Sequence, residues 1–557
     1  MDIRTLTPRL SVGPQIDPGD LKTLAAMGYR AVICNRPDGE AADQPTFEEI
    51  AAAARAEGLE ARHVPIVAGR VEDADVVAFE AALTELPGPV LAYCRTGTRS
   101  TTLWSLSRAG VLKLPDILAI TKAAGYDMGG VVRRIANGGQ TPTDRSDARF
   151  DIAIVGGGAA GIAVAASLRK RQPDLDVAII DPADTHYYQP GWTMVGGGIF
   201  EAAETVRTMG SIIPKGVHWI KAAVAAFEPE ADAVILDGCR VLRYKHLIVC
   251  PGLKLDWHAV DGLVETLGRN GVTSNYRYDL APYTWDLVQG LKSGRAIFTQ
   301  PPMPIKCAGA PQKAMYLSAD AWRRRGVLGD IEIHFANAGG VLFGIADYVP
   351  ALMEYVERYG VALDFHHNLV AVDGPNRIAT FDVTPPVAET RRVKMAFDML
   401  HVCPPQAAPD FIRVSPLADA AGWVDVDQAS LRHRSWDNIW SLGDVMNAPN
   451  AKTAAAARMQ APIVAANIDA AMRGRGPVAR YNGYGSCPLT VERGKIVLAE
   501  FGYGGTLLPS FPEALIDGTR PSRAAWLLKE KILPPVYWRG MLKGREWLVR
   551  PEPVTVD

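Results

Sequence analysis

A glycine-rich turn near residue 156 constrains the fold of this chain more than any other feature. The strand-like residues 151–155 lead into Gly156-x-Gly158-x-x-Gly161, and a helical pattern follows from residue 162. In this arrangement the first glycine permits a tight turn, the second lets the backbone approach a pyrophosphate, and the third lets the helix pack on the strand. Asp181, twenty residues beyond Gly161, ends the next strand and is placed to bind a ribose hydroxyl. The sequence therefore predicts a dinucleotide-binding Rossmann unit.

Length and composition predict several globular domains around this unit. At roughly 150 residues per domain, 557 residues allow three or four folded units, and 48% hydrophobic with 22% charged residues is typical of globular proteins. The net charge of -2 and the pI near 6.6 provide no field that would attract a polyanion, so nucleic acid is excluded as a partner. No metal-ligand motif is present, and no metal is expected.

The amino terminus and the cysteine content indicate the compartment. We find no basic segment followed by an apolar one at the amino terminus, and no stretch of about 18 uncharged apolar residues that could span a membrane. Seven cysteines are too few for a secreted disulfide scaffold. We therefore expect a reducing compartment, in which a stable disulfide would be catalytic.

A polar, glycine-rich linker at residues 137–149 separates an amino-terminal domain from the Rossmann unit. Before it, residues 31–34 and 89–94 are short buried strands, and residues 47–57 and 73–86 are alanine-rich helical stretches between them. This alternation predicts a small α/β domain with a parallel sheet. We find no internal repeat, which excludes solenoids and propellers.

Two further segments resemble the second and third fingerprints of the two-dinucleotide flavoprotein family. They are a strand ending in Pro251-Gly252 and a strand ending in Gly443-Asp444. The resemblance implies FAD, with Asp444 on its ribityl chain and Gly252 beside the cofactor. It also implies a second Rossmann unit between these segments, but there the strand 331–335 runs into two adjacent glycines and bulky residues that do not suit a pyrophosphate. The electron partner of the flavin is therefore not expected to be a nicotinamide.

Two cysteines on the flavin side lie in longer motifs. Cys307 stands between Lys306 and Lys313, cations that favour a thiolate, and precedes a helix; Cys487 lies 180 residues later. The region from about residue 150 to 550 resembles sulfide:quinone oxidoreductases of the mitochondrial type, through the motifs Tyr188-Gln-Pro-Gly-Trp-Thr193, Lys306-Cys-Ala-Gly-Ala-Pro-Gln-Lys313, Ala418-Asp-Ala-Ala-Gly-Trp-Val-Asp-Val426, Lys452-Thr-Ala-Ala-Ala456 and Tyr484-Gly-Ser-Cys487-Pro.

The resemblance implies roles for residues in these motifs. Cys307 and Cys487 would form a redox-active disulfide or trisulfide beside the flavin. Cys487 would take sulfur from sulfide as a persulfide, and Cys307 would be the thiolate that adds to flavin C4a. Gln189 and Lys452 join the expected flavin-binding residues. Four other cysteines lie in or beside apolar strands and are interpreted as packing thiols: Cys34, Cys239, Cys250 and Cys403.

A cysteine loop ends a buried strand of the amino-terminal domain. In Cys94-Arg-Thr-Gly-Thr-Arg99, backbone N–H groups surround the cysteine and Arg99 closes the ring, so the loop can stabilise a thiolate and an anion. Cysteine phosphatases place five residues between these two positions, whereas four stand here. Residues 10–100 resemble the phosphatase-like sulfurtransferase domain fused to persulfide dioxygenase-like hydrolases, which implies sulfur transfer through Cys94. Asp38 could serve a phosphatase as general acid, although Asp-Gly more often marks a turn.

The carboxyl-terminal segment is basic and aromatic. Residues 520–550 hold eight basic and two acidic residues, a local charge of +6, interleaved with tryptophan, tyrosine and aliphatic residues, and Pro534-Pro535 divides them into two short predicted helices. This composition is typical of an amphipathic segment that docks on a membrane surface. The alternative is a charged helix whose apolar side covers the domain core.

Together these features predict an α/β protein with five parts: a phosphatase-like, rhodanese-like sulfurtransferase domain (1–136), a linker (137–149), an FAD domain (150–290 and 406–515), a second Rossmann-like domain with a degenerate NAD fingerprint (291–405) and a membrane-docking segment (516–557). The predicted enzyme oxidises sulfide, reduces a ubiquinone-type quinone, and passes sulfur through Cys94 to a small thiol, sulfite or cyanide. Its expected location is the cytoplasm, peripheral on the inner face of the plasma membrane. The alternative is a type II NADH:quinone oxidoreductase-like flavoenzyme with an amino-terminal protein phosphatase or docking domain. A homo-oligomer is left open.

Overall fold

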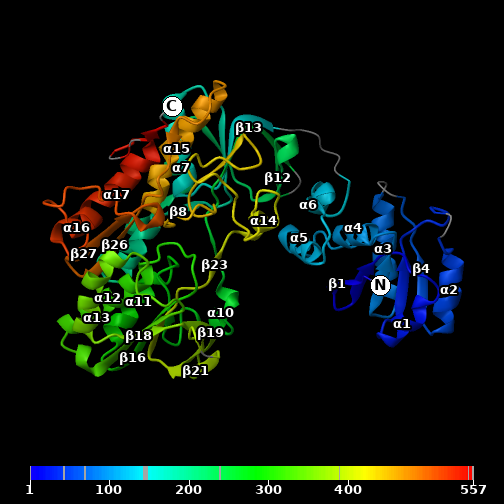
Figure 1. Ribbon diagram of the computed structural model, residues 1–557, viewed down its shortest axis with the longest axis horizontal. Coiled ribbons are helices and arrows are strands. Elements are labelled where there is room, and N and C mark those ends of the chain that lie inside the picture. Colours follow the sequence, from blue (N-terminus) through cyan, green and yellow to red (C-terminus); the bar gives the residue numbers. More distant parts are fainter. Residues whose placement is uncertain are drawn as a thin grey trace. The chain divides into compact units, whose positions relative to one another are not determined.

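The computed structural model describes residues 2–41, 44–67, 71–141, 148–237, 240–387, 389–547, 549 and 551–554. The chain forms two compact units, which Figure 1 colours along the sequence. The first unit comprises Met1–Arg149, Ala222–Arg243 and Asp410–Pro416. The second comprises Phe150–Lys221, Tyr244–Pro409 and Leu417–Asp557. Cys239 and residues 142–147 of the linker lie outside the described residues.

The first unit is built on a five-stranded sheet. Its order is β1-β2-β5-β3-β4, where β1 runs antiparallel to β2 and the other neighbours are parallel. This arrangement confirms the predicted α/β domain with a parallel sheet. The strands are β1 (Arg4–Thr7), β2 (Leu10–Gly13), β3 (Ala31–Cys34), β4 (Glu60–His63) and β5 (Val90–Tyr93).

Helices cover both faces of this sheet because alternate residues of its buried strands point to opposite sides. Leu91 and Tyr93 of β5 pack in one apolar cluster with α1 and α2, whereas Val90 and Ala92 pack in the other with helices that follow later. The helices are α1 (Asp20–Ala26), α2 (Phe47–Ala56), α3 (Asp73–Glu85), α4 (Thr98–Ser107), α5 (Leu114–Ala123) and α6 (Val132–Ala136).

Two later segments of the chain complete the first unit. The hairpin β11 (Val224–Glu228) and β12 (Ala233–Leu236) contributes Ala225, Ala226 and Ile235 to the same apolar cluster as α3 to α6. The Arg133 guanidinium forms an ion pair of 2.6 Å with Glu228. The first unit therefore draws its core from residues more than 200 positions apart in the sequence.

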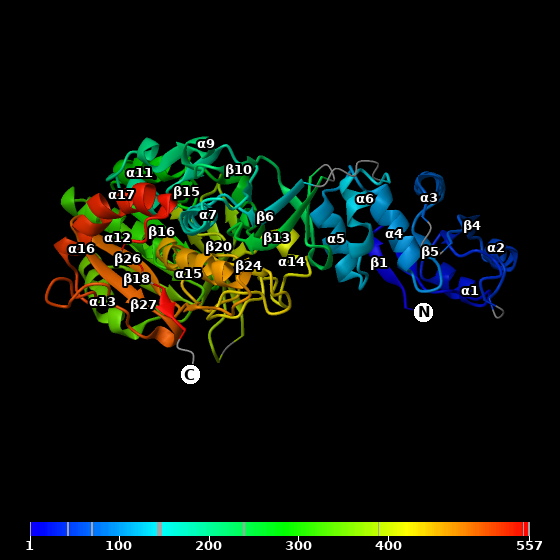
Figure 2. The same cartoon turned by 90° about the horizontal axis from the view of Figure 1, so that it is seen from above.

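The second unit begins with the sheet of the glycine-rich turn. Strands β10-β7-β6-β13 are neighbours, and β24 pairs with β13. Helix α7 (Ala159–Arg171) follows β6 and packs beside α15 (Ala454–Met472), as both Figure 1 and Figure 2 show. The strands are β6 (Ala148–Val155), β7 (Val177–Ile180), β10 (Val217–Ile220), β13 (Val241–Val249) and β24 (Ile439–Ser441).

A second sheet of the same unit is entirely parallel, in the order β15-β22-β16-β17-β18. Besides β17, its strands are β15 (Val272–Thr273), β22 (Met399–His401), β16 (Gly294–Gln300) and β18 (Ala362–Phe365). After β17 (Ile331–Asn337), residues 338–345 form an irregular loop, and the next helical residues begin at Ala346. A helix amino terminus close to the strand end is what binds a pyrophosphate in a Rossmann unit. The end of β17 lacks one, whereas the preceding strand β16 is followed by α12 (Ala310–Arg324).

A hairpin and a helical segment complete the second unit. The hairpin pairs β26 (Gly485–Glu492) with β27 (Lys495–Phe501). The carboxyl-terminal residues are helical from α16 (Arg523–Leu527) through α17 (Leu533–Pro535) to Lys543, with two π turns. A helix boundary lies beside Pro534-Pro535, because α17 begins at Leu533 and both prolines lie in its first turn, where their missing N–H groups need no partner. In the described residues, no helix is long and apolar enough to cross a membrane.

Candidate flavin and sulfur sites

Two of the three glycines of the turn, Gly156 and Gly161, allow close backbone packing. Gly156 has a φ of 107°, and a Cβ there would lie 2.5 Å from the Cys250 carbonyl oxygen. A Cβ at Gly161 would collide with the Gly156 carbonyl oxygen, so only glycine lets α7 start against β6. Gly158 is the N-cap of α7, and nothing lies within 4 Å of where its Cβ would be. The backbone at Gly158 is therefore open to a ligand.

The acidic residues of the fingerprints, Asp181 and Asp444, line one cavity of about 430 Å³ together with Gly158. Asp181 accepts hydrogen bonds from the backbone N–H of Gly157 at 2.6 Å and of Ala183 at 2.8 Å, which orients its carboxylate at the turn. Gly252 and Gly443, with φ of 76° and 80°, bring their backbones to the cavity wall. Burial raises the pKa of Asp444, which follows Gly443.

Two lysines stand near Asp444 in this cavity. Lys452 donates hydrogen bonds to the carbonyl oxygens of Asp444 at 2.6 Å and Met446 at 2.9 Å, and burial lowers its pKa to about 8. Lys306 donates to the Gln189 side-chain oxygen, and burial lowers its pKa. The structure thus brings Gln189, Lys452 and the fingerprint residues to one cavity.

The cavity has polar groups that suit a flavin. Both side-chain atoms of Asn275 and the Thr193 hydroxyl are buried at the cavity wall, without hydrogen-bond partners in the part of the chain that the structure describes. Buried polar atoms without partners are rare in folded proteins, since each costs the desolvation of that group. Together with the open backbone at Gly158, they fit a large polar cofactor bound along the cavity.

The paired cysteines meet beside this cavity. The Sγ atoms of Cys307 and Cys487 are 3.9 Å apart, and Lys313 Nζ lies 3.1 Å from Cys307 Sγ. A hydrogen bond from the Cys487 thiol and the positive charge of Lys313 hold the pKa of Cys307 well below its usual range despite burial. Lys313 is itself buried, and its pKa is raised by the sulfur atoms although burial opposes this. Cys307 is therefore the thiolate of the pair and Cys487 the thiol.

A chamber on the far side of the β26–β27 hairpin continues the same cavity. Cys487 packs with one face of the hairpin, whereas Ser486, Pro488 and Leu498 line the cavity from the other. The carboxyl-terminal helical residues close this chamber with mostly apolar side chains: Leu528, Ile532, Leu533, Val536, Tyr537 and Met541. We call it the apolar chamber.

Lys529 enters the apolar chamber from the segment predicted to dock on a membrane. It is only 5% exposed, its Nζ lies 3.5 Å from the Pro488 carbonyl oxygen, and burial and Lys313 lower its pKa to about 7. Lys529 is one of the basic residues of the segment that the sequence predicts to dock on a lipid surface. The structure buries it instead. Leu527 is 55% exposed and lies outside the cavity lining, whereas Ile532 lines the chamber and is also 50% exposed.

Cys94 stands in the first unit at the end of β5. Its side chain is 1% exposed, and Sγ accepts a hydrogen bond of 3.1 Å from the backbone N–H of Gly97. Gly97 has a φ of 89° and caps α4, so the loop turns sharply around the sulfur. Asp38 Oδ1 accepts from the Phe47 N–H at the start of α2, which is a structural role.

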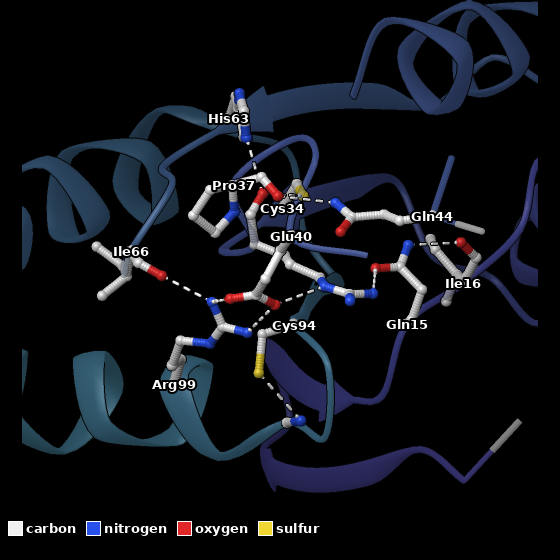
Figure 3. Close-up of polar contacts among 12 residues, drawn as sticks. Gln15, Ile16, Cys34, Pro37, Glu40, Gln44, His63, Ile66, Cys94 and Arg99 are labelled. Carbon is white, nitrogen blue, oxygen red and sulfur yellow. Dashed lines mark hydrogen bonds and ion pairs between the residues drawn. The ribbon is translucent and has the colours of Figure 1, made fainter. Parts of the chain in front are cut away.

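Arg99 is held by a carboxylate that the sequence did not suggest. Figure 3 shows Glu40 and Arg99 facing each other beside Cys94. Arg99 donates two hydrogen bonds to Glu40, at 2.9 and 2.8 Å, and one to the Ile66 carbonyl oxygen at 2.7 Å. Arg36 Nε donates to the same carboxylate at 2.7 Å. These hydrogen bonds, that of Arg99 first, lower the pKa of Glu40 to about 2, so it stays charged.

The chain matches two families. Residues 2–111 match the family described as "Beta-lactamase hydrolase-like protein, phosphatase-like domain", and residues 150–284 match "Pyridine nucleotide-disulphide oxidoreductase". The mitochondrial sulfide:quinone oxidoreductase of Mus musculus is 38% identical over 395 residues, which are 71% of this chain and 87% of that protein. The one from Dictyostelium discoideum is 40% identical over 430 residues, 77% and 93% of the two chains. The chain belongs to the sulfide:quinone oxidoreductase family.

This membership confirms the predicted resemblance, the fold class and the prediction of an oxidoreductase with a flavin. The solved sulfide:quinone oxidoreductase of Aquifex aeolicus has the same fold, with a TM-score of 0.60 at 18% identity over 73% of this chain and 98% of that one. The amino-terminal residues are instead 36% identical, over 134 residues, to a Beta-lactamase hydrolase-like protein of Xylella fastidiosa (strain Temecula1), covering 24% of this chain and 31% of that one.

The remaining described cysteines of this sulfide:quinone oxidoreductase family member are buried thiols. Burial raises the pKa of Cys34 and that of Cys250. It raises the pKa of Cys403 to about 12. A thiol with a raised pKa is protonated and weakly nucleophilic at neutral pH. Their environment contrasts with that of Cys307.

Proposed function

We propose that the protein oxidises sulfide with a bound flavin and passes the electrons to a quinone. The observation that supports this most directly is the buried pair of Cys307 and Cys487 with Lys313 beside the thiolate. The printed names of the mouse and Dictyostelium relatives supply the two substrates. The NADH-oxidising alternative would leave this buried cysteine pair without a role.

We propose FAD as the flavin. Gly156, Gly158 and Gly161 would give its pyrophosphate access to the start of α7, and Asp181 would bind a ribose hydroxyl. On the other side of the cavity the residues that would hold the cofactor are Gln189, Gly252, Gly443, Asp444 and Lys452. When bound, the flavin supplies a two-electron acceptor that can in turn reduce a quinone.

The sulfur chemistry follows from the asymmetry of the cysteine pair. In the oxidised enzyme a disulfide would join Cys307 and Cys487. Hydrosulfide attacks Cys487 Sγ, the S–S bond breaks, and Cys487 becomes a persulfide while Cys307 leaves as a thiolate. Lys313 stabilises that leaving thiolate by its charge. Two electrons then leave this site. Their loss joins Cys307 to the persulfide sulfur as a trisulfide or, once an acceptor has taken that sulfur, to Cys487 as the disulfide.

Anaerobic addition of sulfide to the yellow protein tests this function. One equivalent should bleach the flavin absorbance, and a water-soluble quinone should restore it, whereas NADH should do neither. Bleaching by NADH and not by sulfide would favour the alternative enzyme.

We propose that the apolar chamber binds the quinone and that the carboxyl-terminal segment docks on the membrane that holds it. The chamber wall is mostly apolar, and Leu527 and Ile532 of the same segment are exposed. Filling the chamber with Val536→Trp should raise the KM for quinone and leave bleaching by sulfide unchanged. An unchanged KM would place the quinone elsewhere.

For the amino-terminal domain we propose sulfur transfer through Cys94. The hydrogen bond from Gly97 to Sγ and the neutralised Arg99 suit a sulfane sulfur better than a phosphate dianion. Persulfide sulfur would pass from Cys487 to the Cys94 thiolate and then to a small thiol, sulfite or cyanide. After turnover without added thiol, mass spectrometry should find one extra sulfur, about 32 Da, on the Cys94 peptide. Its absence, or hydrolysis of a phosphotyrosine mimic instead, would overturn this role.

We further propose a peripheral location on a membrane surface. The names of the mouse and Dictyostelium relatives contain the word mitochondrial. The inner face of the plasma membrane stays a prediction, as do the five domain boundaries and a homo-oligomer.

A further inference from the structure

A buried carboxylate in the apolar chamber has no part in the chemistry described so far. Glu500 lies on β27, opposite Ser486 of β26, and is 5% exposed. It lines the cavity together with Tyr484 and Ser510. An ionisable group buried in an otherwise apolar wall is costly, which makes a functional role worth testing.

The hydrogen bonds of Glu500 connect the chamber to the surface. Tyr484 Oη donates to Glu500 Oε1 at 2.5 Å, and Ser510 Oγ donates to the same oxygen at 2.6 Å. The Ser510 N–H donates to Oε2 at 3.0 Å, and the two hydroxyls lie 3.1 Å apart. Tyr484 is buried at the chamber wall, whereas Ser510 is exposed to solvent. Three proton-carrying groups therefore stand in sequence from chamber to water.

The other acidic and basic groups of the cavity have different partners. Asp181 and Asp444 belong to the flavin end. His186 shares its ring nitrogens with the Gly157 carbonyl oxygen at 3.2 Å and Tyr537 Oη at 2.6 Å, both buried groups. Lys529 is buried beside Pro488. Among the carboxylates of the described residues that line the cavity, Glu500 is the one bonded to an exposed hydroxyl.

The reaction itself requires a proton from solvent. With a thiol as sulfur acceptor, the balanced reaction is HS⁻ + RSH + quinone + H⁺ → RSSH + quinol. Sulfide is oxidised by two electrons, the quinone is reduced by two, and one proton more than hydrosulfide and thiol supply must enter per turnover. A quinone in a mostly apolar chamber needs polar groups that carry that proton to it.

We propose that Ser510, Glu500 and Tyr484 form the proton-entry path for quinone reduction. This inference rests on the quinone lying in the apolar chamber. The Glu500 carboxylate first takes a proton from Ser510 Oγ, which water replaces. As the quinone oxygen takes up the Tyr484 hydroxyl proton, the protonated Glu500 carboxyl group gives its proton to Tyr484 Oη, so the path returns to the carboxylate with which it started.

The test replaces Glu500 by the isosteric amide, Glu500→Gln, in the full-length holoenzyme. Bleaching by sulfide should keep its wild-type rate, because Cys307 and Cys487 are untouched. Reoxidation of the reduced enzyme by quinone should slow by at least about 100-fold, the lower end of the usual contribution of a proton-transfer group. Formate or azide, small weak acids that can enter the chamber, should restore part of the rate.

Two controls make the outcome decisive. Glu492→Gln removes a carboxylate that is 8% exposed in the same hairpin and does not line the cavity, and it should reduce quinone at the wild-type rate. Tyr484→Phe should slow reoxidation like Glu500→Gln, and the double variant should be no slower than either. A normal rate in Glu500→Gln, or a slow rate that no small acid rescues, would overturn the path. A failure of the quinone site would show separately, as an unchanged quinone KM in Val536→Trp.

Discussion

The two cysteine sites of this chain control their sulfur atoms by opposite means. Cys307 lies beside the buried ammonium of Lys313, with the Cys487 thiol on its other side. Cys94 receives a backbone N–H from Gly97, and the nearby Arg99 guanidinium is neutralised by Glu40. A buried cation that is not balanced by an acid lowers a thiol pKa strongly, as Lys313 does at Cys307. The first site is therefore built to release a thiolate, whereas at the second a backbone N–H contacts the sulfur and a carboxylate holds the guanidinium.

The largest effect expected is the loss of either flavin-side cysteine. Cys307→Ser and Cys487→Ser should lower sulfide-dependent quinone reduction by more than about 10³-fold, the scale of losing a nucleophile. The flavin should stay bound, because other residues form its cavity. The control Cys34→Ala removes a buried thiol of the first unit and should leave bleaching by sulfide unchanged. Normal turnover in Cys487→Ser would refute the disulfide chemistry.

Removing the cation beside Cys307 tests whether Lys313 is what distinguishes this site from that of Cys94. In Lys313→Met the pKa of Cys307 rises, and at neutral pH each unit of rise lowers the thiolate population about 10-fold. Bleaching by sulfide at pH 7 should slow by about 10 to 100-fold and should speed up as pH increases toward 9, where the thiolate returns. Stopped-flow measurements of bleaching between pH 7 and pH 9 check that the rate increases with pH. A pH-independent rate equal to wild type would mean that Lys313 does not set the thiolate.

The carboxylate at the other site offers the reverse experiment. Glu40→Gln leaves Arg99 and Arg36 without their acid, so an anionic reagent should approach Cys94 more easily. Alkylation by iodoacetate relative to neutral iodoacetamide should increase by about 3 to 10-fold, the effect of one nearby charge at moderate ionic strength. Glu48→Gln, on the exposed side of α2, is the matched control and should leave the ratio unchanged. The same ratio in both variants would show that Glu40 does not shield the thiol.

A smaller effect is expected at the proposed membrane-docking surface of the carboxyl-terminal segment. Replacing the exposed Leu527 and Ile532 by serine should weaken binding to anionic vesicles by about 10-fold, since each side chain would bury apolar area in lipid. Sulfurtransferase activity of Cys94 should not change. Flotation assays measure the vesicle binding, and unchanged binding would argue that this surface is not the docking face.

Local sequence patterns predicted those features that depend on residues close together in the chain. The spacing of Gly156, Gly158 and Gly161 is fixed by backbone contacts within one turn, and Asp181 follows one strand later. The paired cysteines required the family resemblance, because nothing in the 180 residues between them indicates that they meet. The sequence also predicted the parallel sheet of the first unit from its alternating elements.

Other residues of the sites could not be predicted, because tertiary packing alone brings them there. Glu40 and Arg99 are 59 positions apart and belong to no shared motif. Lys529 was grouped with the basic residues of its segment, and only the packing of that segment over the β26–β27 hairpin buries it. Asn275 and Glu500 lie in ordinary strand and loop sequences. Their signal is that their polar atoms are buried at a cavity, which no periodicity reveals.

The hairpin of β11 and β12 has a consequence for how the two halves of this fusion can be separated. Because Ala225, Ala226 and Ile235 share an apolar cluster with the helices before the linker, a protease that cuts the linker would leave residues 1–141 bound without a covalent bond to the rest. The cut protein should migrate as one particle in a native gel and as two chains after denaturation. The residues before the linker are thus connected to the later residues in two ways, by the peptide chain and by the apolar cluster that they share with the hairpin.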